Sequence, residues 1–173
     1  MKRSAVISGL VVCAGCAGQS AVQPVSYFFD CDTAAARSSA WSRTVDHRAA
    51  GFSGTMEFVE IREHEQWSPA ATILLNGPTA TEFTGFRVLR SPSSQGELRV
   101  SFIGERSLES EEDLGPIASS TSPIPFEIRY EDGKATYRLG GMVKVVDTLR
   151  FAVDKASLGC STAEVKFDGV QVR

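Results

Sequence analysis

The carboxylates best suited to acid–base chemistry are clustered between Glu57 and Glu65. Two carboxyl groups on one face of a strand can serve as the acid and the nucleophile of glycoside hydrolysis. On a regular strand, Glu60 and Glu63 point to opposite faces, whereas Glu63 and Glu65 share a face about 6 to 7 Å apart. This spacing is common, and a solvated strand end beside Arg62 is the alternative interpretation. We therefore assign no catalytic residue and lean towards a protein that is not an enzyme.

Two tryptophans and a histidine form a second candidate site, for ligand binding. Exposed aromatic rings can stack on sugar faces, and an imidazole can donate a hydrogen bond to a ligand hydroxyl. Trp41, His64 and Trp67 are the candidate ligand-binding residues. The alternative is that both tryptophans pack against the core, as large aromatic side chains usually do.

No metal or cofactor is expected from the sequence. Only two histidines are present, so a zinc site built from histidine and cysteine is improbable. Acidic residues occur at Asp30 and Asp32 and within 109–113, but neither run has the glycine-punctuated spacing of a calcium-binding loop. No phosphate-binding loop, dinucleotide fingerprint or serine nucleophile elbow occurs.

Residues 1–15 have the order of a secretory signal peptide. A basic start, Met1–Arg3, precedes an apolar run over residues 5–12 and the small residues Ala14 and Gly15. The apolar run is shorter than the ~20 residues that a membrane helix needs. The pattern predicts an exported protein in which residues 16–24 form a tether and residues 25–173 a single domain.

The end of this segment, Cys-Ala-Gly-Cys at residues 13–16, resembles the lipobox of bacterial lipoproteins. The resemblance implies that Cys16 is acylated and anchors the domain to the membrane of the bacterial cell envelope, in the periplasm or at the outer membrane. Cys13 departs from the leucine that the motif usually has. An ordinary signal peptidase would instead release a secreted domain by cutting after a small residue, Ala17, Ser20 or Ala21.

The two cysteines beyond the signal segment predict a disulfide. Cys31 and Cys160 form an isolated pair in a protein expected to meet an oxidising compartment. Cys31 ends one apolar stretch and Cys160 opens another, 163–172, so we expect the first and last strands to be antiparallel neighbours joined at that end. Two unpaired buried thiols are the alternative.

The sequence pattern predicts an all-β chain. Its clearest element is a hairpin over residues 126–139. Asp132-Gly133 is the signal of a two-residue type I′ turn. Pairing outward from that turn places Phe126, Ile128 and Tyr130 on the same face as Tyr137 and Leu139, and charged residues on the other. A one-residue slip would destroy both faces, so the register is strongly specified.

The remaining strand expectations rest on shorter patterns. Residues 86–88 and 98–102 form a second hairpin, and 149–153 and 163–172 form strands, the last with a β-bulge at Asp168-Gly169. Residues 70–75 are apolar on both faces, which indicates a central strand covered on both sides. Residues 105–125 are polar and proline-containing and form the longest predicted loop.

Many short strands with the first and last adjacent indicate a two-sheet antiparallel β-sandwich or jelly roll, with a lipocalin-like barrel as the runner-up. Four segments resemble the concanavalin A-like lectin and glucanase superfamily, namely residues 51–58, 67–71, 126–130 and 160–170. The resemblance implies a concave sheet that holds saccharide. Laminarinase-type relatives carry Glu-x-Asp-x-x-Glu there, and Val59 stands where that motif needs aspartate after Glu57.

These observations favour a non-catalytic, lipid-anchored protein that binds a ligand such as a glycan. A structural or assembly lipoprotein that binds an envelope protein is one alternative, and a divergent glycoside hydrolase using Glu57, Glu63 or Glu65 is another. The net charge of −3 argues against nucleic acid as a partner, because nucleic-acid binding needs a basic surface.

Overall fold

The computed structural model describes residues 25–90, 97–104, 111–117 and 123–173. The predicted signal peptide, the tether and Cys16 lie outside the described residues. None of the residues described forms a helix with the length and apolar character needed to cross a membrane.

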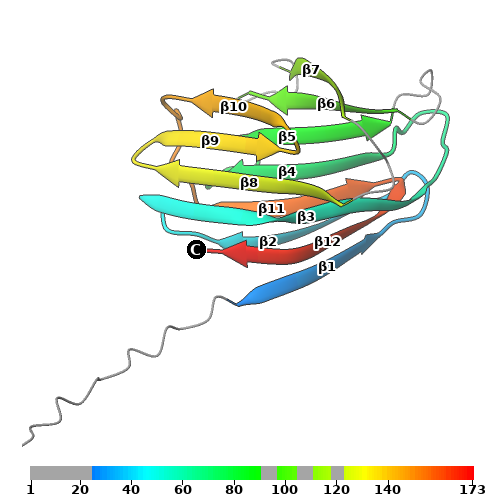
Figure 1. Ribbon diagram of the computed structural model, residues 1–173, viewed down its shortest axis with the longest axis horizontal. Helices are drawn as coiled ribbons and strands as arrows, with labels where there is room; N and C mark the ends of the chain where they lie inside the picture. The colour runs from blue at the N-terminus through cyan, green and yellow to red at the C-terminus, as the bar shows by residue number, and fades with distance from the viewer. Residues whose placement is uncertain (1–24, 91–96, 105–110, 118–122) are drawn as a thin grey trace, which may run out of the picture.

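The described residues form two antiparallel sheets of six strands each, stacked as two layers (Figure 1). Sheet A has the order β1 (Ser26–Asp32), β12 (Ala163–Val172), β3 (Ala49–Ile61), β8 (Ile124–Glu131), β9 (Lys134–Leu139) and β10 (Met142–Val146). Sheet B has the order β2 (Ser38–Thr44), β11 (Lys155–Ser161), β4 (Ala70–Asn76), β5 (Phe83–Arg90), β6 (Leu98–Ile103) and β7 (Glu111–Ile117).

This architecture confirms the predicted jelly-roll sandwich. The first and last strands are neighbours, because β1 pairs with β12 from Ser26–Gln171 to Asp32–Glu164. The lipocalin-like barrel is wrong: the two sheets stay separate and each ends in its own edge strands. The inward side chains of both sheets form one core instead, as expected for a sandwich.

The β8–β9 hairpin has the predicted register. Ile128 lies opposite Tyr137, Glu127 opposite Arg138, and Glu131 opposite Lys134 next to the turn. The turn residues Asp132 and Gly133 both have positive φ, as a type I′ turn requires. The apolar face is buried in the core, where the Tyr137 ring meets Phe102 at a centroid distance of 5.1 Å. The hairpin thus joins the two sheets through aromatic packing.

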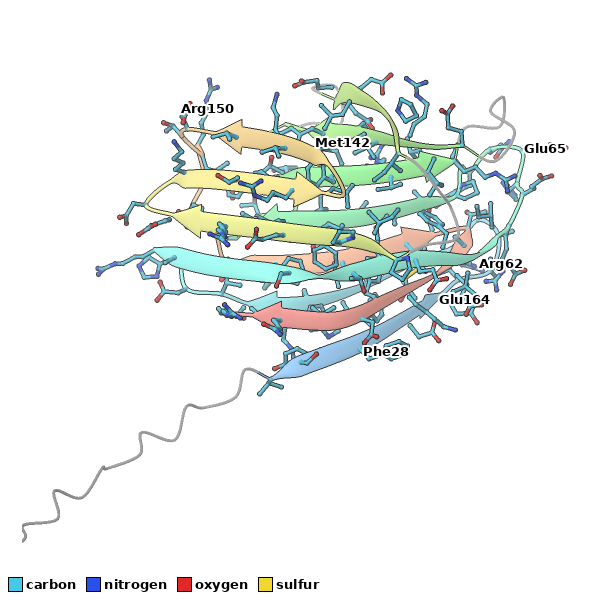
Figure 2. The ribbon with its side chains drawn as sticks, viewed as in Figure 1. Phe28, Arg62, Glu65, Met142, Arg150 and Glu164 are labelled. Carbon is cyan, nitrogen blue, oxygen red and sulfur yellow. A yellow bond between two sulfur atoms is a disulfide. The ribbon has the colours of Figure 1, made fainter. Side chains whose placement is uncertain are left out.

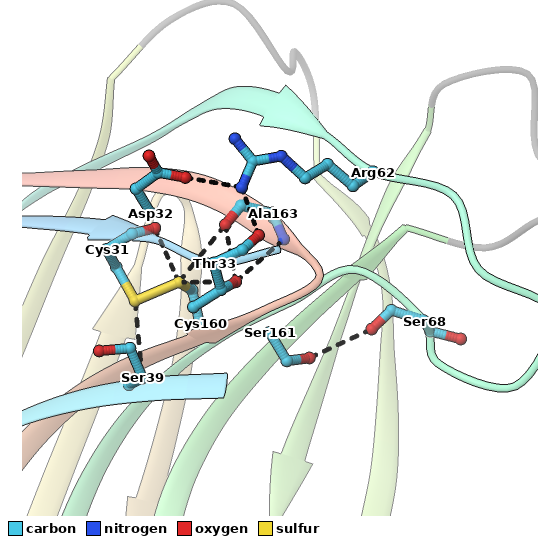
Figure 3. Close-up of a disulfide and its surroundings, with 9 residues drawn as sticks. All are labelled: Cys31, Asp32, Thr33, Ser39, Arg62, Ser68, Cys160, Ser161 and Ala163. Carbon is cyan, nitrogen blue, oxygen red and sulfur yellow. Dashed lines mark hydrogen bonds and ion pairs between the residues drawn. A yellow bond between two sulfur atoms is a disulfide. The ribbon is translucent and has the colours of Figure 1, made fainter. Parts of the chain in front are cut away.

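The Cys31–Cys160 disulfide is present, but it joins different strands from those predicted (Figure 3). Cys160 lies on β11 of sheet B and Cys31 on β1 of sheet A, with a Cα–Cα distance of 5.9 Å. The bond therefore connects the two sheets, and the β1–β12 pairing is independent of it. Thr162, at φ 52°, is the corner through which the chain passes from β11 to β12.

The disulfide is enclosed by hydrogen bonds around Thr33. The Thr33 hydroxyl donates to the carbonyl of Ala163 at 2.9 Å, and Arg62 donates to the carbonyl of Thr33. Arg62 also pairs with Asp32 at 2.6 Å and Glu60 at 2.7 Å (Figure 3 shows the Asp32 contact), and these carboxylates raise the pKa of the guanidinium. The corner is thus closed by a covalent bond and by charge-assisted hydrogen bonds.

Three smaller expectations are corrected. Residues 149–153 are not a strand, although Leu149, Phe151 and Val153 are buried. The predicted loop over 105–125 contains strand β7, and the rest of it up to residue 122 lies outside the described residues. β4 is central, as predicted, but only one of its faces packs on the core.

Two other expectations are confirmed. β5 and β6 pair as a hairpin with Val88 opposite Val100 and Phe86 opposite Phe102. The β12 register shifts between Asp168 and Gln171, where Gly169 has a φ of 61°, as a bulge at this position requires.

Candidate functional site

The outer face of sheet B carries a hollow of about 530 Å3 over β2, β11, β4 and β5. Side chains alternate along a strand, so residues between the core positions point away from the core. Here those outward side chains are mostly small, and they leave a depression in the sheet surface. The hollow is lined by Ser38, Ser39, Ala40, Ala70, Thr72, Arg87, Leu89, Gly159, Cys160 and Ser161.

Gly159 lies at the bottom of the hollow, and its lack of a side chain leaves the space open. A Cβ at this position would meet Thr72 Oγ1 at 2.9 Å and the carbonyl oxygen of Ser39 at 3.1 Å. Any larger residue would therefore push against both neighbouring strands and fill the hollow from below. The backbone itself forms this part of the surface.

A second hollow of about 470 Å3 lies over β5, β6 and β7, and Leu89 lines both. Its wall is a network of charged and polar groups. Arg87 pairs with Glu111 at 3.1 Å, and Ser101 donates to the same carboxylate. Arg99 pairs with Asp113 on β7. Donors and acceptors thus lie side by side in two neighbouring depressions that share Leu89, and we call the two together the sheet B hollow.

One carboxylate of this network, Asp113, is poorly suited to act as a general acid. The backbone N–H of Gly115 and, next, the guanidinium of Arg99 lower the pKa of Asp113 below its ordinary value of 3.8. A general acid needs a raised pKa instead. Glu111 and Asp113 are the carboxylates among the residues that line the hollow, and each is paired with an arginine. Asp113 is therefore held as an ionised hydrogen-bond acceptor.

Trp41 points away from the hollow. It lies on β2 opposite Leu158, and its ring stacks on Phe52 of sheet A at a centroid distance of 6.4 Å. The guanidinium of Arg43 covers the rings of Trp41 and Tyr27 at 5.5 and 4.8 Å. Trp41 therefore packs at the open edge between the sheets.

His64 and Trp67 lie in the connection between β3 and β4. Trp67 is 44% exposed, and His64 accepts a hydrogen bond from the backbone N–H of Gln66 at 3.2 Å. Ser68, the next residue, lines the hollow and accepts a hydrogen bond from Ser161 at 3.3 Å (Figure 3). Trp67 thus immediately precedes the rim of the hollow, and the structure separates it from Trp41.

The acidic candidates do not gather at the hollow. Glu57 lies on β3 of sheet A, opposite Lys166. Glu60 pairs with Arg62. β3 ends at Ile61, so Glu63 and Glu65 belong to the exposed connection that follows, and the strand spacing expected for them does not apply (Figure 2 labels Glu65).

The described carboxylates of the 109–113 run are used in ion pairs. Glu111 pairs with Arg87, Asp113 with Arg99, and Glu112 with Lys144. In the part of the chain that the structure describes, no cluster of three metal-ligating side chains is found.

The polar network of the hollow was missed from the sequence. Arg87, Arg99 and Ser101 stand at the outward positions of β5 and β6, between the buried residues of each strand. Their alternation with apolar residues is a visible signal. Their acidic partners come from β7, in a segment predicted to be a loop.

Compared by sequence, the chain matches no protein-family model and no curated protein. Compared by structure, it has several matches. A PL7 alginate lyase from Zobellia galactanivorans is 11% identical with a TM-score of 0.58; the match covers 77% of this chain and 64% of the lyase. The Crh5 transglycosylase is 8% identical with a TM-score of 0.58, covering 84% and 70%.

A galectin from Caenorhabditis elegans, LEC-6, is 10% identical with a TM-score of 0.54, and the match covers 84% of this chain and 95% of the galectin. At these identities the similarity establishes the fold alone. The chain is therefore a jelly-roll β-sandwich similar to those of lyases and lectins, and it spans just under two thirds of the alginate lyase.

Proposed function

We propose that this protein is an exported, lipid-anchored β-sandwich that binds a glycan in the sheet B hollow without cleaving it. The observation that carries the proposal is the network of Arg87, Ser101 and Glu111, which line the two depressions of the hollow. Sugar hydroxyls donate and accept hydrogen bonds, so they need neighbouring acceptors and donors. The network offers both within one wall.

The comparisons support a saccharide as the ligand. The structural neighbours include an alginate lyase, a transglycosylase and a galectin, three kinds of protein that act on or bind carbohydrate. Trp67, beside the rim, supplies an exposed ring of the kind that stacks on sugars. The paired, pKa-lowered carboxylate of Asp113 supports binding without turnover.

Two features support the proposed location outside the cytoplasm, the disulfide and the lipobox-like Cys16. A disulfide is characteristic of proteins that fold outside the cytoplasm. The lipobox-like Cys16 supports attachment to the bacterial envelope, and β1 begins at Ser26, a short tether away from it. Intact-mass measurement of protein from its native membrane fraction tests this part: an acyl-glyceryl mass on Cys16 is expected, and an unacylated cut beyond Cys16 would contradict it.

An oligosaccharide array tests the binding itself. Alginate, β-glucan and galactoside oligosaccharides are presented to the wild-type protein and to Arg87→Ala. We expect binding by the wild type and an affinity at least about tenfold lower for the variant, since hydrogen bonds to charged groups contribute about 1.5 to 3 kcal/mol. Silence of the wild type across the array would contradict glycan binding, and release of new reducing ends would contradict the absence of cleavage.

Arg138→Ala is the matched control. Arg138 is an exposed arginine that also pairs with a glutamate, Glu127, at 3.7 Å. It lies on the outer face of sheet A, away from the hollow. The control is expected to bind like the wild type. Equal losses in both variants would show that the effect comes from lost charge and not from the hollow.

A further inference from the structure

Aspartate or asparagine followed by glycine occurs three times in the sequence, at Asn76-Gly77, Asp132-Gly133 and Asp168-Gly169. In such a pair, the backbone nitrogen of the glycine can attack the side-chain Cγ of the preceding residue, and the missing Cβ of glycine leaves room for the ring that forms. Because the reaction is intramolecular, its rate depends on whether the fold holds the nitrogen against the side chain or keeps the two apart. The three pairs differ in this respect.

Asn76-Gly77 is held in an arrangement that opposes the attack. The Asn76 amide donates to the Ser157 hydroxyl at 2.7 Å, so the side chain is directed across to β11. The Gly77 N–H donates to the carbonyl of Glu82 at 2.7 Å, and the carbonyl of Asn76 accepts from the N–H of Asp154 at 2.8 Å. The side chain and the nitrogen that would attack it thus each have a partner outside the pair. Ring closure would have to break both of these hydrogen bonds.

Asp132-Gly133 is the turn of the β8–β9 hairpin, and its backbone is fastened on both sides. The Asp132 N–H donates to the carbonyl of Arg48 at 2.8 Å, and the carbonyl of Gly133 accepts from the N–H of Leu149 at 2.7 Å. Both turn residues have positive φ, as the tight hairpin requires. Rotation of this pair towards a ring would therefore disturb the turn and both of its backbone contacts.

Asp168-Gly169 brings the two reacting groups together. The Gly169 N–H donates to Oδ1 of Asp168 at 2.7 Å, so the nitrogen lies against the carboxyl group. Among the described residues, neither of the other two pairs has this contact. Asp168 and Gly169 are both exposed, so solvent water reaches them.

The backbone at this pair lies in a bulge. The pairing of β12 with β3 passes from Asp168 to Gln171, and its pairing with β1 passes from Phe167 to Val170. Gly169 is therefore skipped on both sides of β12, although β12 is an interior strand of sheet A (Figure 1). A bulge leaves its extra residue outside the ladder of hydrogen bonds. The peptide unit between Asp168 and Gly169 can thus rotate with less loss of pairing than in a regular strand.

We propose that Asp168-Gly169 is a site of spontaneous isoaspartate formation in the folded protein. The Gly169 nitrogen forms a bond to Cγ of the protonated Asp168 carboxyl, and the nitrogen's proton leaves with the carboxyl OH as water. The product is a cyclic succinimide. A second water opens it, either at Cγ, which restores aspartate, or at the main-chain carbonyl carbon, which leaves isoaspartate with the main chain running through Cγ. Water is the only co-reactant, and neither the ligand nor the anchor takes part.

Isoaspartate adds a carbon to the main chain where β12 lies close to β3. The carbonyl of Asp168 accepts a hydrogen bond from the Thr55 hydroxyl at 3.4 Å, and a Cβ at Gly54 would lie 3.0 Å from the same oxygen. Val170, directly after the pair, is fully buried. The longer main chain shifts Val170 within a close-packed core, so the modified protein should unfold at a lower urea concentration.

Peptide mapping by mass spectrometry, after incubation in water enriched in heavy oxygen, tests the site. Each passage through the succinimide brings one solvent oxygen into the carboxyl group, and fragmentation distinguishes isoaspartate from aspartate. The incubation is done at mildly acidic pH, where part of the aspartate carboxyls are protonated. In the folded protein, we expect isoaspartate and label to accumulate at least about threefold faster at Asp168 than at Asp132, because the reacting groups are already in contact.

The protein unfolded in urea provides the reference rates. Without the fold, the two Asp-Gly pairs should react at equal rates, and Asn76 should lose its amide faster than it does in the folded protein. Asp168→Glu should remove isoaspartate and label from this position, because the longer side chain does not form the succinimide ring. Asp147→Glu is the matched control: Asp147 is exposed but precedes Thr148, so this variant should be modified at Asp168 like the wild type.

Three results would overturn the proposal. The first is equal modification of Asp168 and Asp132 in the folded protein, and the second is faster modification of Asp132. The third is an Asp168 that stays unmodified in the folded protein while the unfolded protein reacts.

Discussion

At the scale of single residues, two of the three arginines that line the hollow are paired with carboxylates. Arg87 and Arg99 each meet a carboxylate from the edge strand β7. Paired charges keep donors and acceptors in fixed positions without attracting ions of one sign over long distances. These paired groups are the donors and acceptors that the proposed glycan would meet.

Asp113 gives this network a measurable pH dependence. Its pKa is lowered in the folded protein, first by the Gly115 N–H and then by Arg99, so the folded state binds the proton less well than the unfolded state. Its stabilising contribution is present above pH 3.8, the ordinary value, and is lost as the pH falls through the lowered pKa. A carboxyl NMR titration should show Asp113 titrating below its ordinary range.

The Arg99→Ala variant distinguishes the two causes of the lowered pKa of Asp113. The Gly115 N–H bond of 2.9 Å remains in this variant, so the pKa of Asp113 should rise only part of the way to its ordinary value. A complete return would show that the arginine is the main cause. An Asp113 that titrates at its ordinary value in the wild type would contradict the network.

At the scale of elements, the hairpin over β8 and β9 was predictable down to its register. The Asp132-Gly133 turn and the two opposite faces of the strands all require the same pairing. The partner strand of the disulfide was not predictable. A single residue, Thr162, turns the chain between sheets at positive φ, where β-branched residues are rare, so the sequence shows no turn there.

The connection over residues 147–154 shows why alternation alone does not define a strand. Its backbone is used for hydrogen bonds to other elements: Leu149 donates to Gly133 at 2.7 Å, and Asp154 donates to Asn76 at 2.8 Å. Phe151, 7% exposed, packs beside Gly77 at the end of β4. The connection therefore fastens the hairpin turn of sheet A to sheet B.

Phe151→Ala should destabilise the protein by about 3 to 5 kcal/mol, as for a buried phenylalanine in a core. Equilibrium urea unfolding gives the free energy of unfolding. Ala152→Ser, at the exposed neighbouring position, is the control and should change it by less than about 0.5 kcal/mol. A loss below about 1 kcal/mol for Phe151→Ala would show that the connection is not part of the core.

At the scale of the whole molecule, the disulfide constrains nearly the entire described chain. Cys31 and Cys160 are separated by 129 positions, and the bond joins the two sheets. The chain-entropy account predicts that closing so long a loop stabilises chiefly by restricting the unfolded state. The packed core should therefore persist without the bond, with reduced stability.

Replacing both cysteines by alanine should lower the free energy of unfolding by about 2 to 5 kcal/mol. Urea denaturation of this variant, and of the wild type with and without reductant, provides the measurement. Reduced wild type and the double variant should agree within error. An unchanged unfolding midpoint in both would contradict the assigned role of the bond.

The sandwich itself could be inferred from the sequence, but the hollow could not. Strand alternation, turn residues and the paired cysteines indicate two packed sheets. The hollow depends on which strands become neighbours, since Gly159, Thr72 and Arg87 meet only through the order β11, β4, β5. That order is set by contacts distant in sequence, which local patterns do not encode.

The most direct test of glycan binding in the sheet B hollow is an amide chemical-shift titration of the full domain with an oligosaccharide that binds on the array. We predict that the perturbed amides belong to β4, β5, β6 and β11 and include those of Arg87, Ser101 and Gly159. Perturbations confined to the outer face of sheet A, or no saturable perturbation at all, would contradict the account.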